Sequence, residues 1–313
     1  MRIIIKRIKN KWKKQGLAGV LSALKNHFHK GIAWARFGPL SELLSRIFPI
    51  VNKPILIISF PRSGSSWVGE IIGTAKSALY LREPITCFYR RKNTEGIIVE
   101  VDPNSPPYIY KKYGNRAFSG IPDFPTEVVK FPDDWKLSKR KSSRLVIKEV
   151  NPLAIEWFIK SINPSIVILL RHPAAITLSF LSLNWWKNKE SSAWFFYGDR
   201  IGSVLKILYE NILEYRDYKV FFYEDLCRDT VKKFKEMFQY CNLKIDENVM
   251  QRIEKTTSCG SINEIYGTER NTREMHSKWR ENVSNEQLKQ LKSGYMKHNL
   301  PWYMDDVYWI IDR

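Results

Sequence analysis

The chain of 313 residues is 44% hydrophobic and 27% charged, which provides enough apolar mass for a folded core and excludes a disordered protein. The 51 lysines and arginines exceed the 32 aspartates and glutamates, so the formal net charge is +19 and an anionic partner is expected: an acidic ligand, a membrane surface or a nucleic acid. Ten of the basic residues and no acidic residue fall within residues 1–41, so more than half of the excess charge belongs to this segment.

The first predicted element is a basic amphipathic helix. Its apolar residues recur at helical spacing between lysines: Ile4, Ile5, Ile8 and Trp12. Such a helix lies in an anionic membrane surface or packs its apolar face on the rest of the protein, and both interpretations remain open. The uncharged stretch 15–24 is too short to span a bilayer, and no signal peptide is expected. We predict a leader over residues 1–50 and a main folded domain over residues 51–313.

Beyond Pro54 the chain alternates between short apolar runs and helical patterns. The apolar runs are typical of strands buried on both faces and cover residues 55–60, 145–147, 166–170 and 220–223. The helical patterns cover residues 153–162, 173–183, 203–215 and 230–241. Strands that alternate with helices predict an α/β fold with a central parallel sheet. Between Glu83 and Ser143 seven prolines and many aromatic residues interrupt this alternation, which predicts a long, irregular insertion.

A loop rich in serine and glycine follows the first predicted strand. Its sequence is Pro61-Arg62-Ser63-Gly64-Ser65-Ser66-Trp67, and a helical pattern begins directly after it. Backbone N–H groups at a helix N-terminus, together with hydroxyl groups and a guanidinium group, form a site for phosphate or sulfate. The loop lacks the Gly-x-x-x-x-Gly-Lys-Ser/Thr spacing and its lysine, which argues against a magnesium-dependent ATP or GTP enzyme.

A second pair of anion-binding residues follows another predicted strand. Arg171 comes directly after the run 166–170, and Ser179 lies eight residues later on the helix predicted to begin at Pro173. These two side chains would hold a further phosphate, although Ser179 alone also fits an ordinary residue on a helix surface. Two separate anion sites predict a ligand with phosphate groups at two places.

Together, the serine-rich loop and the pair Arg171 and Ser179 resemble the 5′-phosphosulfate and 3′-phosphate sites of sulfotransferases that use 3′-phosphoadenosine 5′-phosphosulfate (PAPS). The sequence is most similar to carbohydrate 6-O-sulfotransferases and is also similar to tyrosylprotein sulfotransferases. Further similarity lies in residues 80–84, 223–226, 268–273 and 278–280. The resemblance covers roughly residues 54–295. It implies a P-loop-like, three-layer fold and the transfer of a sulfuryl group from PAPS, as co-substrate, to a hydroxyl group.

The resemblance also implies roles for individual residues. Those implied to bind the donor are Arg62, Ser63, Gly64, Ser65, Ser66, Trp67, Arg171, Ser179, Tyr223 and Lys278. Glu83 matches the acid that tyrosylprotein sulfotransferases use as the base, and Lys148 matches their lysine near the transferred sulfur. Arg62 and Lys148 would stabilise the negative charge that develops on the leaving phosphate. Without the resemblance, Glu83 fits a surface acid before a proline; His172 is the next candidate for the base.

The acceptor is the part of the reaction that the sequence specifies least. We expect a carbohydrate or glycolipid hydroxyl, with a peptide tyrosine still open, and we expect residues 84–143 and the pair Trp185-Trp186 to select it. Because the chain begins at Met1 without a spanning helix, we expect a cytoplasmic enzyme, either free or peripheral to the membrane.

Other functions were weighed against this interpretation. A P-loop kinase or NTPase is opposed by the missing lysine, and a non-enzymatic protein that binds nucleic acid or membranes is opposed by the absence of a nucleic-acid-binding motif. No nucleic-acid partner is therefore expected. The cysteines are widely spaced and have no nearby histidine, which predicts no metal site and favours free thiols over the alternative of two disulfides. They are Cys87, Cys227, Cys241 and Cys259.

Overall fold

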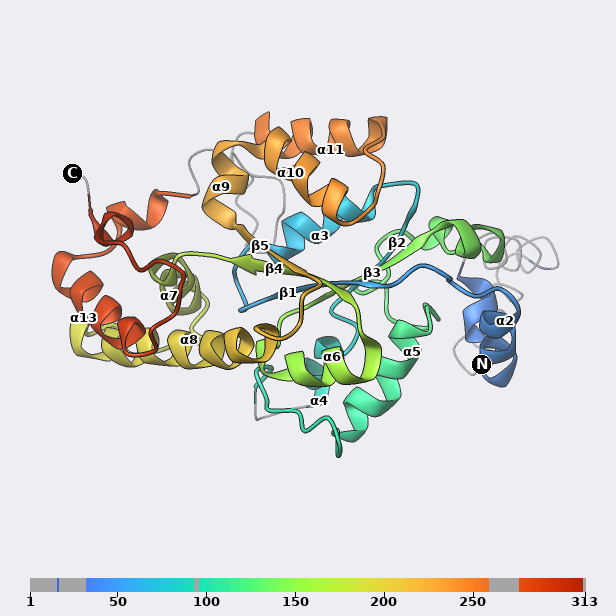
Figure 1. The fold of residues 1–313 in the computed structure, drawn as a ribbon, viewed down its shortest axis with the longest axis horizontal. Helices are drawn as coiled ribbons and strands as arrows, with labels where there is room; N and C mark the ends of the chain where they lie inside the picture. The colour runs from blue at the N-terminus through green and yellow to red at the C-terminus, as the bar shows by residue number, and fades with distance from the viewer. Residues whose placement is uncertain (1–15, 17–31, 93–95, 259–275, 312–313) are drawn as a thin grey trace.

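The structure is a computed structural model that describes residues 16, 32–92, 96–258 and 276–311. The predicted amphipathic helix, the motif at residues 268–273 and Cys259 lie outside the described residues. Figure 1 shows the arrangement of the described elements.

Five parallel strands form one sheet at the centre of the fold. In spatial order they are β2 (Ala78–Arg82), β3 (Arg144–Glu149), β1 (Ile55–Ser59), β4 (Ser165–Leu170) and β5 (Tyr218–Phe222). Every residue of β1 and β4 is buried, which agrees with their uninterrupted apolar sequences. The predicted α/β fold with a central parallel sheet is thereby confirmed. Strand β2 was not predicted.

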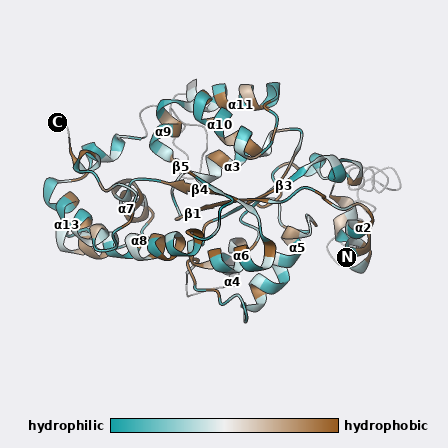
Figure 2. Cartoon of the chain, in the orientation of Figure 1, coloured by the Kyte–Doolittle hydropathy of each residue, from teal (hydrophilic) through white to brown (hydrophobic). Residues whose placement is uncertain are grey.

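Helices cover both faces of the sheet and complete the expected three layers (Figure 1). One layer contains α3 (Ser65–Gly73), α9 (Tyr223–Arg228), α10 (Thr230–Tyr240) and α11 (Glu247–Ser258). The other contains α4 (Thr86–Lys92), α5 (Asn115–Phe118), α6 (Ile155–Ile162), α7 (Pro173–Ser182), α8 (Ser191–Ile212) and α13 (Asn285–Met296). Because successive strand residues point to opposite faces, Ile55 and Ile57 pack with the first layer and Leu56 and Ile58 with the second. Figure 2 shows that the strands are hydrophobic and that α11 and α13 carry many hydrophilic residues.

The long helix α8 packs closely against α13. An added Cβ atom at Gly198 would lie 2.0 Å from the carbonyl oxygen of Leu291, and one at Gly294 would lie 2.0 Å from the carbonyl oxygen of Phe195. Each glycine therefore allows the backbone of one helix to touch the backbone of the other. This contact attaches the C-terminal part of the chain to the domain.

The segment before β1 packs against the domain from residue 32 onward. It forms the 3-10 turn η1 (Ala33–Arg36) and the helix α2 (Pro39–Ile47). The indole Nε1 of Trp34 donates a hydrogen bond to the carbonyl oxygen of Trp135 at 2.7 Å. The buried Arg140, in the turn η4 (Leu137–Ser142), donates to the carbonyl oxygen of Phe48 at 2.6 Å. The boundary at residue 50 between leader and catalytic domain stays a prediction.

No helix in the described part of the chain is both long enough and apolar enough to cross a bilayer.

Candidate active site

The serine-rich loop makes a sharp turn between β1 and α3. Arg62 and Gly64 adopt left-handed backbone conformations, with φ of 71° and 85°. Glycine is needed at position 64, because a Cβ atom there would lie 2.4 Å from the ring of Tyr223. The turn places the first N–H groups of α3 at the carboxyl edge of the sheet, where they can bind an anion.

Two serine side chains lie inside this loop. Ser59 at the end of β1 donates a hydrogen bond from its Oγ to the Oγ of Ser65 at 2.8 Å, which ties the strand to the start of the helix. The Oγ of Ser63 is buried and has no hydrogen-bond partner among the described residues. A buried hydroxyl without a partner is unfavourable in the unliganded protein and is available to a bound oxyanion.

The two anion motifs of the sequence meet at this loop. Arg62 donates from Nε to the Oγ of Ser179 at 2.8 Å, and Arg171 donates from Nη1 to the carbonyl oxygen of Arg62 at 2.9 Å. The guanidinium of Arg171 lies over the ring of Tyr223, 4.5 Å from its centroid. The two anion-binding motifs come together because β1 and β4 are neighbouring strands, so the loops that follow these strands lie at the same edge of the sheet.

Trp67 and Lys278, the remaining predicted donor-binding residues, differ in their surroundings. Trp67 is buried, and its ring packs edge-on against Tyr223 with centroids 5.9 Å apart. Lys278, in the turn η6 (Lys278–Glu281), is exposed.

Glu83 and Lys148 form a buried ion pair at the ends of β2 and β3. Arg90 binds the same carboxylate through Nη2 at 2.7 Å. The backbone N–H of Glu83 donates to the carbonyl oxygen of Lys148 at 2.6 Å. Burial by itself would raise the pKa of Glu83, but the positive charges of Lys148 and Arg90 outweigh it and lower this pKa to about 2. Glu83 is therefore ionised at neutral pH.

The next residue, Glu149, is a buried carboxylate that the sequence analysis missed. Its Oε1 accepts a hydrogen bond from the backbone N–H of Ile85 at 2.7 Å, and its Oε2 accepts one from the hydroxyl of Thr86 at 2.5 Å. Burial raises the pKa of Glu149 to about 7, although the hydrogen bonds oppose this shift. Glu149 thus fixes the start of α4, the helix that carries Arg90. The signal in the sequence that could have identified Glu149 is its position as an acidic residue at the end of an apolar strand.

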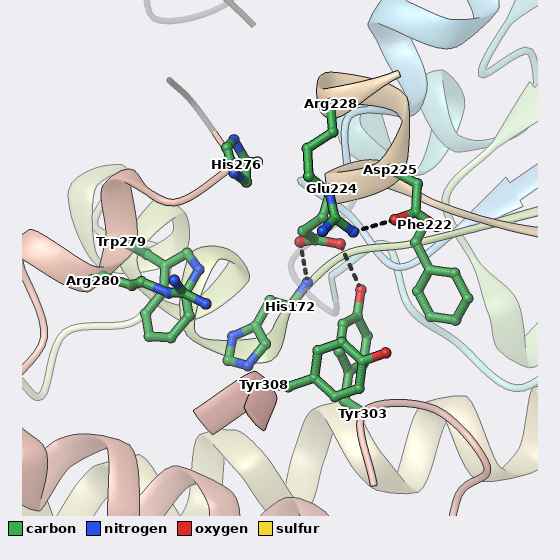
Figure 3. Close-up of a pocket in the computed structure, with 10 residues that line it drawn as sticks. All are labelled: His172, Phe222, Glu224, Asp225, Arg228, His276, Trp279, Arg280, Tyr303 and Tyr308. Carbon is green, nitrogen blue, oxygen red and sulfur yellow. Dashed lines mark hydrogen bonds and ion pairs between the residues drawn. The ribbon is translucent and has the colours of Figure 1, made fainter. Parts of the chain in front are cut away.

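His172 lies in a different, aromatic environment, which Figure 3 shows. Its ring stacks on that of Trp279, with centroids 4.3 Å apart and planes 3° apart. Burial lowers the pKa of His172 to about 3, so the imidazole is neutral. Its Nδ1 accepts a hydrogen bond from the backbone N–H of Ala174 at the start of α7. His172 therefore caps a helix, and Glu83 remains the better candidate for the base.

Glu224 supports the same region. It accepts hydrogen bonds from the backbone N–H of His172 and from the hydroxyl of Tyr303, both at 2.9 Å (Figure 3). These bonds connect the strand end that carries Arg171 to the C-terminal segment. The arrangement holds the backbone beside Arg171 in place.

A cavity of about 570 Å³ lies beside the serine-rich loop. Its wall is mostly aromatic and aliphatic, with two guanidinium groups, and consists of Phe60, Pro61, Tyr89, Arg90, Gly96, Ile97, Ile98, Phe180, Trp185, Trp186 and Arg200. Phe60 and Pro61 lead into the loop, and Arg90 binds Glu83, so the cavity adjoins both the anion site and the candidate base. It includes the Trp185-Trp186 pair that was expected to select the acceptor.

A family model described as "Sulfotransferase domain" matches residues 52–300. The chain belongs to the sulfotransferase family. This confirms the resemblance at the level of the family and identifies the protein as a sulfotransferase. The carbohydrate 6-O type and the tyrosylprotein type both stay predictions.

Solved structures similar to this chain have low sequence identity to it. The sulfotransferase domain of the Synechococcus PCC 7002 olefin synthase is 17% identical with a TM-score of 0.45, covering 80% of this chain and 96% of that chain. Mouse sulfotransferase SULT7A1, complexed with PAP, is 15% identical with a TM-score of 0.43, and the match covers 85% of this chain and 90% of the mouse chain. Retinol dehydratase, in complex with androsterone and inactive cofactor PAP, is 16% identical with a TM-score of 0.44, covering 83% and 85%. No curated protein matches the sequence.

Proposed function

We propose that this sulfotransferase transfers the sulfuryl group of PAPS to a hydroxyl group of its acceptor. The observation that carries the proposal is the convergence of Arg62, Arg171 and Ser179 on the loop at the start of α3. PAPS has a 5′-phosphosulfate and a 3′-phosphate, and the two neighbouring anion motifs supply one site for each.

The PAPS donor would form hydrogen bonds with polar groups that lack a full set of hydrogen-bond partners within the described part of the protein. The N–H groups of the loop and the buried Oγ of Ser63 would donate to the 5′-phosphosulfate. Arg171 and Ser179 would bind the 3′-phosphate, which replaces the hydrogen bond between Arg62 and Ser179. Tyr223 and Trp67 would position the nucleotide. Lys278, in the C-terminal part of the chain, would approach the nucleotide as well.

The chemical step requires one base and stabilisation of one leaving group. As the acceptor oxygen bonds to sulfur, the bond between sulfur and the bridging oxygen of the 5′-phosphate breaks, and Glu83 takes the acceptor proton. The negative charge that appears on the phosphate is stabilised by Arg62 and Lys148. Because Lys148 holds the pKa of Glu83 low, movement of Lys148 toward the leaving phosphate raises this pKa and makes Glu83 a better base.

The acceptor would occupy the cavity beside Phe60. Trp185 is 42% exposed there and offers a flat apolar surface to a ring. The wall combines apolar surface with the hydrogen-bonding side chains of Tyr89, Arg90, Trp185, Trp186 and Arg200, so it can bind both the apolar and the hydroxyl groups of a glycoside. Of the expected acceptors, a glycolipid or another glycoside with an apolar body fits this cavity better than a free sugar. Peptide tyrosine is the alternative to be tested alongside it.

Donor binding is tested by thermal unfolding with nucleotides. Adenosine 3′,5′-bisphosphate should raise the melting temperature without magnesium, and it should do so more than ADP because only the bisphosphate occupies both anion sites. Arg171→Ala should reduce this stabilisation, and Arg228→Ala, an exposed arginine on α9, should leave it unchanged. Equal stabilisation by ADP, or a strict need for magnesium, would contradict the proposal and favour a kinase. Labelled PAPS with glycoside, glycolipid and tyrosine acceptors then identifies the acceptor class.

A further inference from the structure

The helix α2 and the residues beside it present a row of large apolar side chains to solvent. Their exposed fractions range from 40% to 62%, and they are Phe37, Leu40, Leu43, Ile47, Phe48 and Val51. Leu40, Leu43 and Ile47 are three and four residues apart, which places them on one face of the helix. A helix on the surface of a soluble protein normally turns polar residues outward. The outer face of α2 therefore differs from that of an ordinary surface helix.

The inner face of α2 already has a partner. Leu44 packs against the cluster formed by Trp34, Ala35 and Ile121. Arg140 holds the end of the helix through the carbonyl oxygen of Phe48. Because α2 is fixed to the domain by its other side, the exposed row is a surface feature of the folded protein.

Exposed basic residues occur on the segment that carries this row and near the residue that contacts it. Arg36 and Arg46 are exposed on the same segment, and Lys136 and Lys141 are exposed on either side of Arg140, which contacts α2. Glu42 is the single acidic residue of α2. The row begins within residues 1–41, a segment that has ten basic and no acidic residues. An apolar strip with a cationic border complements an interface of lipid tails and anionic headgroups.

We propose that this face, made of residues 36–51 with Lys136 and Lys141, docks on an anionic lipid bilayer. The apolar side chains enter the boundary between headgroups and acyl chains, and the basic side chains pair with the headgroups. Docking through this face holds the catalytic domain at a membrane surface. The proposal stands on exposure and charge alone, and it does not depend on the identity of the donor or the acceptor.

The test measures sedimentation of the full chain with vesicles of phosphatidylcholine, alone or in an equimolar mixture with phosphatidylserine. The wild-type protein should bind the mixed vesicles far better than the neutral ones. The variant Leu40→Ser/Leu43→Ser/Ile47→Ser should bind them at least about tenfold more weakly, because it removes the apolar contact. Lys136→Gln/Lys141→Gln should weaken binding to the mixed vesicles only.

The matched control is Phe196→Ser/Leu213→Ser/Val307→Ser, which changes three equally exposed apolar residues elsewhere and should bind like the wild type. Stabilisation by adenosine 3′,5′-bisphosphate should be the same in all four proteins, which shows that each is folded. Unchanged vesicle binding by the α2 variant would overturn the proposal. A dimer in light scattering that the α2 substitutions abolish would assign the face to a second copy.

Discussion

At the carboxyl ends of β2 and β3, the ion pair between Glu83 and Lys148 is closed off from solvent, with side chains 6% and 2% exposed. Two buried charges are tolerated only while each has its partner, and removal of one typically costs about 3–5 kcal/mol. The pair therefore holds an ionised carboxylate and a lysine, whose pKa is lowered by burial, at the place where the proposed reaction uses them.

Glu83→Gln tests the role of this carboxylate. Turnover should fall by about 10²- to 10⁴-fold, because the amide cannot accept the proton, and the binding of adenosine 3′,5′-bisphosphate should be nearly unchanged. Steady-state kinetics and calorimetry measure the two effects. Glu156→Gln, on the exposed face of α6, serves as the control. Unchanged turnover in Glu83→Gln would mean that another group is the base.

Glu149 gives the protein a pH-dependent stability. Its pKa is raised from 4.5 to about 7 by folding, so the folded state binds a proton that the unfolded state releases, and the contribution of Glu149 to stability falls as pH rises from 4.5 through 7. This contribution is on the order of 3 kcal/mol. Folding lowers the pKa of His172 to about 3, which changes stability in the opposite direction below pH 6.5, so the test compares the wild type with Glu149→Gln. In urea unfolding, the free energy of the wild type minus that of the variant should fall between pH 5 and 8. A wild-type curve with the same slope as that of the variant would refute this assignment.

The lowered pKa of Glu83 changes the stability of the protein in the opposite direction and in another pH range. Because folding lowers it to about 2, the stability that it contributes is present above pH 4.5 and is lost as pH falls toward 2. The two neighbouring carboxylates therefore affect stability in separate pH ranges, and unfolding experiments above pH 5 report on Glu149 without interference from Glu83.

Among the elements, α8 and α13 depend on each other through Gly198 and Gly294. Gly294→Ala should destabilise the protein by about 1–3 kcal/mol, because the added methyl group meets the carbonyl oxygen of Phe195. In an open helix the same change would be stabilising by about 1 kcal/mol. Ser293→Ala, at the exposed neighbouring position, is the control in thermal unfolding. A more stable Gly294→Ala protein would contradict the close packing of the helices.

Elements with strong apolar patterns could be predicted from the sequence, and those with mixed patterns could not. Strands β1 and β4 are uninterrupted apolar runs, so their prediction was straightforward. Strand β2 reads Ala-Leu-Tyr-Leu-Arg and was noted only for its resemblance. Helix α8 begins twelve residues before its predicted start, and this missed part contains Gly198 and Gly202, which are packing positions.

The individual motifs of the candidate site could be predicted from the sequence, but the contacts between residues far apart in the sequence could not. The serine-rich loop and Arg171 were identified from their positions after apolar runs. That Glu83 binds Lys148, 65 residues away, depends on the parallel register of β2 and β3, which no local pattern specifies. Glu149 was missed for the same reason, because its partners Ile85 and Thr86 belong to a different part of the sequence.

In the molecule as a whole, the strand order divides the site into two halves. The loops after β1 and β4 carry the anion-binding groups, and the ends of β2 and β3 carry Glu83 and Lys148. Because β1 lies between β3 and β4, its loop borders both halves. The sulfuryl group would therefore be transferred at the boundary, with the donor on one side and the acceptor on the other.

The hydrogen bond between Arg62 and Ser179 has a consequence for the order of events. In the structure the arginine and the serine are hydrogen-bonded to each other. A donor bound as proposed would have to displace this bond, so its apparent affinity would be lowered by the free energy of the bond. Re-formation of the bond after turnover would favour release of the spent nucleotide.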